Sequence, residues 1–170
     1  MPKRFLLFAL FLTLTQSITI ASEDTKTRPN KQEIIDMMLQ ASRLSAQEQS
    51  SRLDQILKNQ EDSKTPRSDF MFCTGLAYQG NYKAQMCVGA AFEKNLGIVE
   101  DMSEAYTWYE LALANTIPDQ ADAQKAEANR DRVKEKLVSA YPHPTEDDLT
   151  DLVNAQKTRI AQYQDQIKKK

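Results

Sequence analysis

The chain has 170 residues, 27% of them charged, and a formal net charge of −2 at pH 7. Mixed charge without a concentrated basic face argues against nucleic acid as the main partner, because phosphate binding needs such a face. The length suffices for one domain with a modest core. Only four glycines are present, and the β-branched residues are scattered rather than clustered into strands. This composition favours an all-helical fold.

Residues 1–21 carry the features of a cleaved signal peptide. Lys3 and Arg4 precede an apolar run that ends at Leu14, and Ala21 offers a small residue for cleavage. An uncleaved membrane anchor is the alternative, but the run is shorter than the roughly 20 residues that a spanning helix needs. We therefore expect a periplasmic or secreted protein without stable membrane insertion. Loss of Lys3 and Arg4 changes the net charge from −2 to −4.

The mature chain is predicted to begin with a flexible lead-in over residues 22–30, which are polar. Residues 31–67 then predict a helical hairpin followed by a charged linker. Asn30 is placed to cap the first helix. Ser45, with a glutamate three residues later, forms a capping box for the second helix.

Two helices are predicted next, and their apolar faces should make the centre of the core. Ser68 is expected to cap a helix that ends near Gln79. Gly80 and the residue after it can turn the chain into another helix that reaches about Lys94.

The remaining chain predicts three more helices. Asp101 with Glu104 three residues later resembles a capping box, and it opens a helix rich in aromatic residues. Pro118 suits the first turn of an alanine-rich helix. Residues 142–170 begin with a Pro-His-Pro break and continue from Thr145 as a C-terminal capping helix.

A pattern of small, aromatic and loop residues runs through the middle of the chain. Its members are Ala84, Gly89, Phe92, Gly97, Asp101, Ala105, Trp108, Tyr109 and Ala112. Every spacing agrees with the Sel1-like repeat, a relative of the tetratricopeptide repeat (TPR), which this stretch resembles. Most departures are apolar replacements, and Asn95 stands in place of a loop glycine. Because Asn tolerates a left-handed backbone, the loop can keep its shape.

The resemblance implies both a fold and a function. In the repeat, Gly89 permits close helix contact, Gly97 allows the turn between helices, and Trp108 and Tyr109 fill the core. A lone repeat cannot bury its own faces. We therefore predict an all-α fold of antiparallel helical hairpins, stacked as a short TPR/Sel1-like α-α solenoid with capping helices, with residues 68–141 as the repeat region. Similar proteins hold other proteins, so the implied function is an exported interaction module or adaptor, neither an enzyme nor a cofactor-binding protein.

Cys73 and Cys87 are the only cysteines. In an oxidising compartment such a pair tends to close into a disulfide. If the chain reverses at Gly80, each cysteine lies seven residues from the turn, and the two face each other across an antiparallel helix pair. A continuous helix would instead hold them roughly 21 Å apart at 1.5 Å per residue, as two buried thiols. We expect the disulfide.

No arrangement of residues points to a catalytic or metal site. A Ser-His-Asp or zinc site would have to use His143, the single histidine. His143 lies between two prolines, which is typical of a surface loop. The acidic pair Asp147 and Asp148 suits the first turn of a helix.

Tyr78 and Tyr82 flank the expected turn and are the residues that we predict at a partner surface. Two other functions stay open from sequence alone. One is a small envelope enzyme or a cell-wall or β-lactam-binding protein, since some Sel1-like relatives are associated with such binding. The other is a structural subunit of a secretion or conjugation apparatus.

Overall fold

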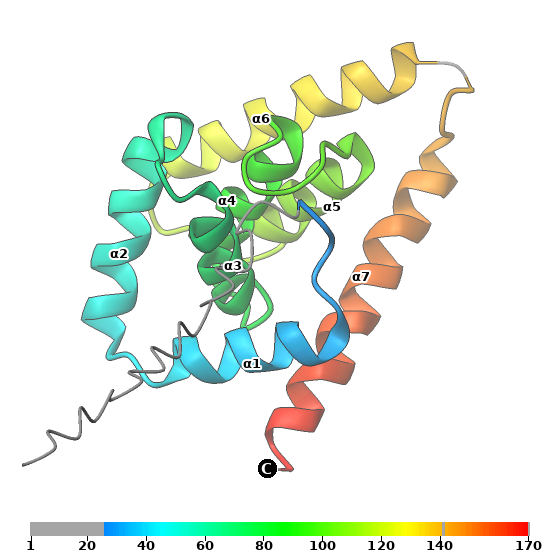
Figure 1. Ribbon diagram of the computed structural model, residues 1–170. Helices are drawn as coiled ribbons and strands as arrows, with labels where there is room; N and C mark the ends of the chain where they lie inside the picture. The colour runs from blue at the N-terminus through cyan, green and yellow to red at the C-terminus, as the bar shows by residue number, and fades with distance from the viewer. Residues whose placement is uncertain (1–25, 141, 170) are drawn as a thin grey trace, which may run out of the picture.

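The computed structural model describes residues 26–140 and 142–169. Within these residues the chain forms seven α-helices, one short 3₁₀ helix and no strand, which confirms the predicted all-helical fold (Figure 1). The predicted signal peptide lies outside the described residues. No helix of the described part is both long and apolar enough to cross a bilayer. The elements are α1 (Lys31–Ser42), α2 (Ala46–Asn59), η1 (Gln60–Asp62), α3 (Pro66–Ala77), α4 (Tyr82–Glu93), α5 (Met102–Leu113), α6 (Gln120–Ser139) and α7 (Glu146–Ile167).

Side-chain caps fix most helix starts. Complete capping boxes open α1, α2 and α7, where the sequence predicts starts at Asn30, Ser45 and Thr145. Asp101 also caps α5, because its side chain accepts the backbone N–H of Glu104 at 2.9 Å. The second half of that predicted box is absent within the described residues, since the Glu104 carboxylate binds the N-terminal segment.

Two helix starts differ from the prediction. α3 begins at Pro66 rather than after Ser68, because the fixed φ of proline suits the first helical position. α6 begins at Gln120, with Asp119 as its cap, so Pro118 lies before the helix and not in its first turn. In both cases the chain uses a start signal that lies within two residues of the predicted one.

Residues 26–30 are extended and lie against the start of α5. Arg28 forms ion pairs with both Asp101 and Glu104. The backbone N–H of Val99 donates to a carbonyl of the segment at 3.3 Å. The part of the expected flexible lead-in that the structure describes therefore makes specific contacts.

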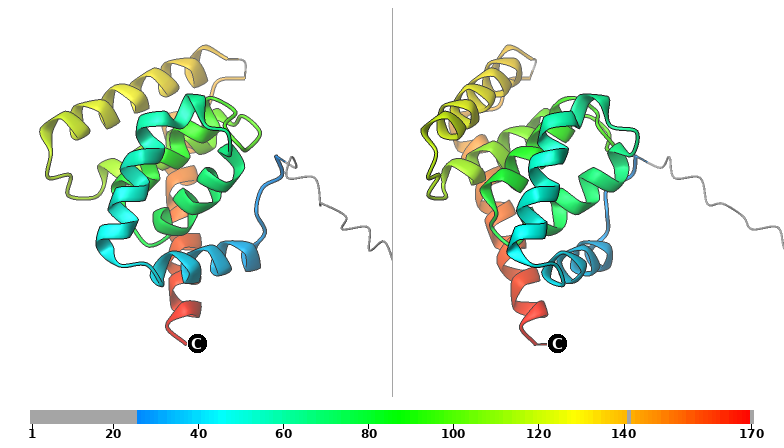
Figure 2. Two further views of the ribbon diagram at one scale, coloured as in Figure 1. Left: turned by 60° about the vertical axis from the view of Figure 1, so that its left-hand side comes forward. Right: turned by 90° about the vertical axis from the view of Figure 1, so that its left-hand side faces the viewer.

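α1 and α2 separate instead of packing together as the predicted hairpin. α1 packs against α3, and α2 packs against α4 and η1. The two helices leave their shared corner in different directions, as Figures 1 and 2 show. The physical reason is that the buried residues of the two helices face different neighbours. α1 buries Ile34, Met38 and Ala41, whereas the buried residues of α2 are Leu53 and Ile56.

From α3 to α6 each helix packs against the next, and α7 crosses back over α5 to reach α1. α4 and α5 approach closely at Gly89, where an added Cβ would lie 2.8 Å from the Tyr109 ring. The loop between them uses two left-handed residues, Asn95 at φ 58° and Gly97 at φ 74°. These three residues behave as the sequence pattern predicts.

The core lies where α3, α4 and α5 meet. Trp108 and Tyr109, predicted as core residues, are 2% and 0% exposed. Trp108 packs edge-on against Tyr78, with ring centres 5.3 Å apart. The aromatic centre of α5 therefore holds the surrounding helices together and presents no surface to a partner.

Candidate partner-binding groove

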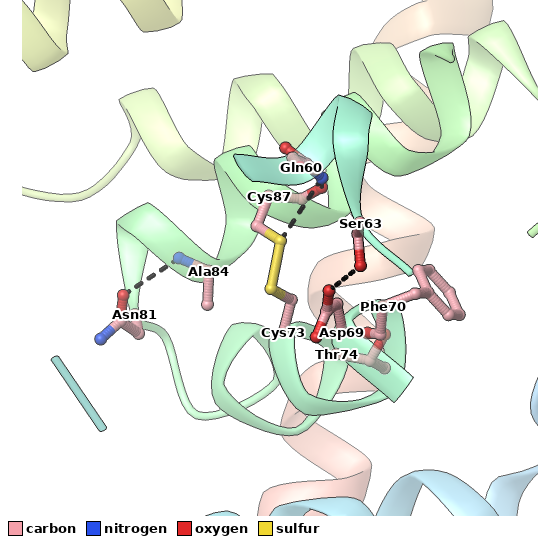
Figure 3. Close-up of a disulfide and its surroundings, with 9 residues drawn as sticks. All are labelled: Gln60, Ser63, Asp69, Phe70, Cys73, Thr74, Asn81, Ala84 and Cys87. Carbon is pink, nitrogen blue, oxygen red and sulfur yellow. Dashed lines mark hydrogen bonds between the residues drawn. A yellow bond between two sulfur atoms is a disulfide. The ribbon is translucent and has the colours of Figure 1, made fainter. Parts of the chain in front are cut away.

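A disulfide joins Cys73 of α3 to Cys87 of α4, with Cα atoms 6.1 Å apart (Figure 3). The chain reverses between the two helices at Gly80, which has a positive φ of 91°. The structure confirms the predicted disulfide and the predicted reversal of the chain at Gly80. Gln60 of η1 donates from Nε2 to the Cys87 carbonyl oxygen at 2.8 Å. This bond fixes the end of α2 against the bridged hairpin.

A groove of about 270 Å³ lies between the C-terminal end of α2 with η1, the side of α4 that carries Lys83 and Ala90, and α6. We call it the α2/α4/α6 groove. Leu57 of α2 and Ala90 of α4, both partly buried, supply its least polar lining. Asn59 and Gln60 stand on one wall and Asn129 on the other. Helices far apart in the sequence therefore share one concave surface.

Charged side chains of both signs line this groove. Its cations are Lys58, Lys83, Lys94, Lys125 and Arg132, and its acids are Glu61, Asp62 and Asp122. Three of the cations are paired: Lys83 with Asp54, Lys94 with Glu61, and Arg132 with Glu93.

Lys58 on α2 and Lys125 on α6 differ from the other cations of the groove. Among the described residues, neither ammonium group has a carboxylate within salt-bridge distance. They stand on different walls of the groove. Two unpaired positive charges therefore line the groove, which also carries the carboxylates of Asp62 and Asp122.

A buried carboxylate holds the α6 wall in place. The Glu93 side chain is 3% exposed and accepts bonds from Arg132 at 2.8 and 2.7 Å, from Lys136 at 3.2 Å and from the Tyr109 hydroxyl at 3.1 Å. Burial alone would raise the pKa of Glu93, but the bonds from Arg132 and Lys136 outweigh it and lower the pKa to about 2. Burial and the Glu93 charge both raise the pKa of Tyr109. Glu93 is thus ionised and links α4, α5 and α6.

Tyr82 lies beside the groove and is partly buried at the contact between α4 and α6. Its hydroxyl donates to Asp122 at 2.9 Å, and Asp122 lines the groove. Burial, followed by the Asp122 carboxylate, raises the pKa of Tyr82. Tyr82 therefore positions Asp122, and its partly exposed side chain is accessible at the edge of the α2/α4/α6 groove.

The prediction of Tyr78 as a partner-surface residue is wrong. Tyr78 is 3% exposed and stacks on Tyr163 of α7, with ring centres 5.4 Å apart. Its hydroxyl accepts from Gln156 at 3.2 Å, and its carbonyl accepts from Gln164 at 2.8 Å. α7 covers this residue, which the position beside the turn did not indicate. Tyr78 is a core residue that attaches α7 to α3.

His143 is exposed in the loop before α7, as predicted for a surface residue, and its Nδ1 lies 2.7 Å from the Ala140 carbonyl oxygen. In the described part of the chain, no group of His, Cys, Asp and Glu side chains is arranged to hold a metal ion.

Comparisons of the chain with protein-family models, with curated proteins and with solved structures give no match. A functional assignment must therefore start from the groove and from the sequence pattern.

Proposed function

We propose that this protein is an exported, non-catalytic interaction module that binds another protein in the α2/α4/α6 groove. In this proposal α4 and α5 form a Sel1-like repeat, and the flanking helices cap it as a short solenoid. The repeat pattern from Ala84 to Ala112 and the packing of α3 to α6 in chain order support this arrangement.

The observation that carries the proposal is the pair of free lysines on the two walls of a fixed groove. Lys58 and Lys125 can bind carboxylates of a partner segment, while Leu57 and Ala90 offer it a less polar surface. The disulfide and the Glu93 ion cluster hold the walls before the partner arrives. Such preorganisation lowers the entropy loss on binding.

The disulfide also supports the proposed location. Both cysteines are buried, at 0% and 1% exposure, and they are the only two in the chain. Structural disulfides persist in oxidising compartments and are rare in the cytosol. The mass of the protein isolated from the periplasm or the medium tests this: a chain that begins after Ala21 and whose thiols react only after reduction is expected.

Site-specific photo-crosslinking in the native host tests the groove. A photoreactive residue at Lys125 is expected to capture a defined protein in the exported fraction. The same residue at Lys157, exposed on α7, serves as the matched control and should not capture it.

Charge reversal then tests the role of the lysines in that complex. The double variant Lys58→Glu and Lys125→Glu is expected to weaken binding of the captured protein by at least about tenfold, since two attractive pairs become repulsive. Lys157→Glu should leave the affinity unchanged. Equal capture from both positions, or equal affinity of both variants, would contradict the assignment of this groove.

A further inference from the structure

A second concave surface lies at the corner where α1 and α2 separate. We call it the α1/α3 pocket; its least polar lining comes from Met37, Leu44, Met71 and Phe72. Its volume of about 380 Å³ falls within the range of pockets that bind ligands, roughly 300–1,000 Å³. The pocket exists because α1 packs on α3 whereas α2 turns away to α4. Phe72 and Met71 are therefore only partly covered.

Two arginines stand at the edge of this pocket. The Arg52 guanidinium lies 4.0 Å from the centre of the Phe72 ring. Arg67 donates to the Gly97 carbonyl oxygen at 3.2 Å, and burial, opposed by the charge of Glu33, lowers its pKa. Within the described residues neither guanidinium has a carboxylate at salt-bridge distance.

We infer that the α1/α3 pocket binds a segment of a partner protein in which an aliphatic or aromatic anchor is flanked by acidic residues. The anchor would fill the flexible methionine-lined floor, as buried anchors do in interface hot spots. The acidic residues would pair with Arg52 and Arg67, because a planar guanidinium group can donate two parallel hydrogen bonds to a carboxylate. This surface is separate from the α2/α4/α6 groove, and the inference does not rest on the function proposed for that groove.

The charges favour a partner of this kind over a second copy of the chain. A two-fold interface places the same patch of both copies together, so the arginines of one copy would face those of the other. An acidic segment instead neutralises them. A protruding anchor side chain also suits this concave pocket, whereas a bilayer presents a flat surface.

Fluorescence anisotropy with the full disulfide-bonded protein tests the inference. The probe is a labelled short peptide with a central Leu-Phe pair between acidic residues. Saturable binding is expected, and Arg52→Glu and Phe72→Ala should each weaken it by about tenfold. Lys125→Glu, in the other groove, should leave it unchanged. Matched peptides with Ala-Ala in the centre, or with lysines in place of the acids, should not bind.

The two variants differ in their risk to folding. Arg52 is exposed, so its reversal leaves the core intact, and this variant decides the test if Phe72→Ala lowers the melting temperature. An unchanged affinity in Arg52→Glu would overturn the inference. So would self-association by sedimentation that Phe72→Ala abolishes, or binding to anionic phospholipid vesicles but not to the peptide, because the occupant would then be a second copy or a membrane.

Discussion

Replacing Glu93 with glutamine removes the charge that joins α4 and α5 to α6 while keeping the side chain's size. The pKa of Glu93 falls from an ordinary value of 4.5 to about 2 in the folded chain. Each unit corresponds to about 1.4 kcal/mol, so ionisation of Glu93 contributes about 3 kcal/mol to the free energy of unfolding near neutral pH. We expect Glu93→Gln to lose about this amount. Arg132 and Lys136, with side chains 44% and 49% exposed, stay hydrated in the variant and add little further loss.

The sign of the pH dependence follows from the lowered pKa. The stabilisation is fully present above about pH 4.5 and is lost as the pH falls towards 2, since the unfolded chain binds this proton first. Urea unfolding across this range should show that the free energies of unfolding of the wild type and Glu93→Gln converge as the pH falls. Glu127→Gln, an exposed change on α6, serves as the control. If the stability difference between wild type and Glu93→Gln stays constant from neutral pH to pH 2, the charge of Glu93 is not its cause.

Three further changes test other parts of the fold by chemical unfolding. Cys73→Ser with Cys87→Ser should lower the free energy of unfolding by about 3 kcal/mol, because the bridge restricts the unfolded chain by closing a loop between residues 14 apart in sequence. The reduced wild type should lose a similar amount. Gly97→Ala should cost at least about 2 kcal/mol, since φ is 74° and the new Cβ would lie 2.3 Å from a backbone oxygen. Tyr78→Ala should cost about 3–5 kcal/mol and expose α7 to proteolysis, whereas Tyr82→Ala should cost less because Tyr82 is only partly buried. If Tyr78→Ala and Tyr82→Ala lower the free energy of unfolding by similar amounts, Tyr78 is not the residue that holds α7 in place.

Local signals predicted the parts of the fold that depend on neighbouring residues. Asn30, Ser45 and Thr145 start helices because a capping side chain acts on the next few backbone N–H groups. The disulfide was predictable for a similar reason: a turn at Gly80 places the two cysteines opposite each other whatever the rest of the chain does.

Contacts between distant helices were not predictable in this way. Tyr78 looked open beside its turn, but α7 returns over it from the other end of the chain. The free lysines of the groove, Lys58 and Lys125, had no sequence signal beyond lying on polar helix faces. Gly75 was also missed as a packing residue, although an added Cβ there would lie 2.6 Å from the Met37 carbonyl oxygen of α1.

The two walls of the α2/α4/α6 groove depend on different chemistry, and this separates their responses to solution conditions. Gln60 holds the α2 wall through the backbone of the disulfide-bonded Cys87. Glu93 holds the α6 wall through ion pairs. Reductant should therefore loosen the first wall and acid the second.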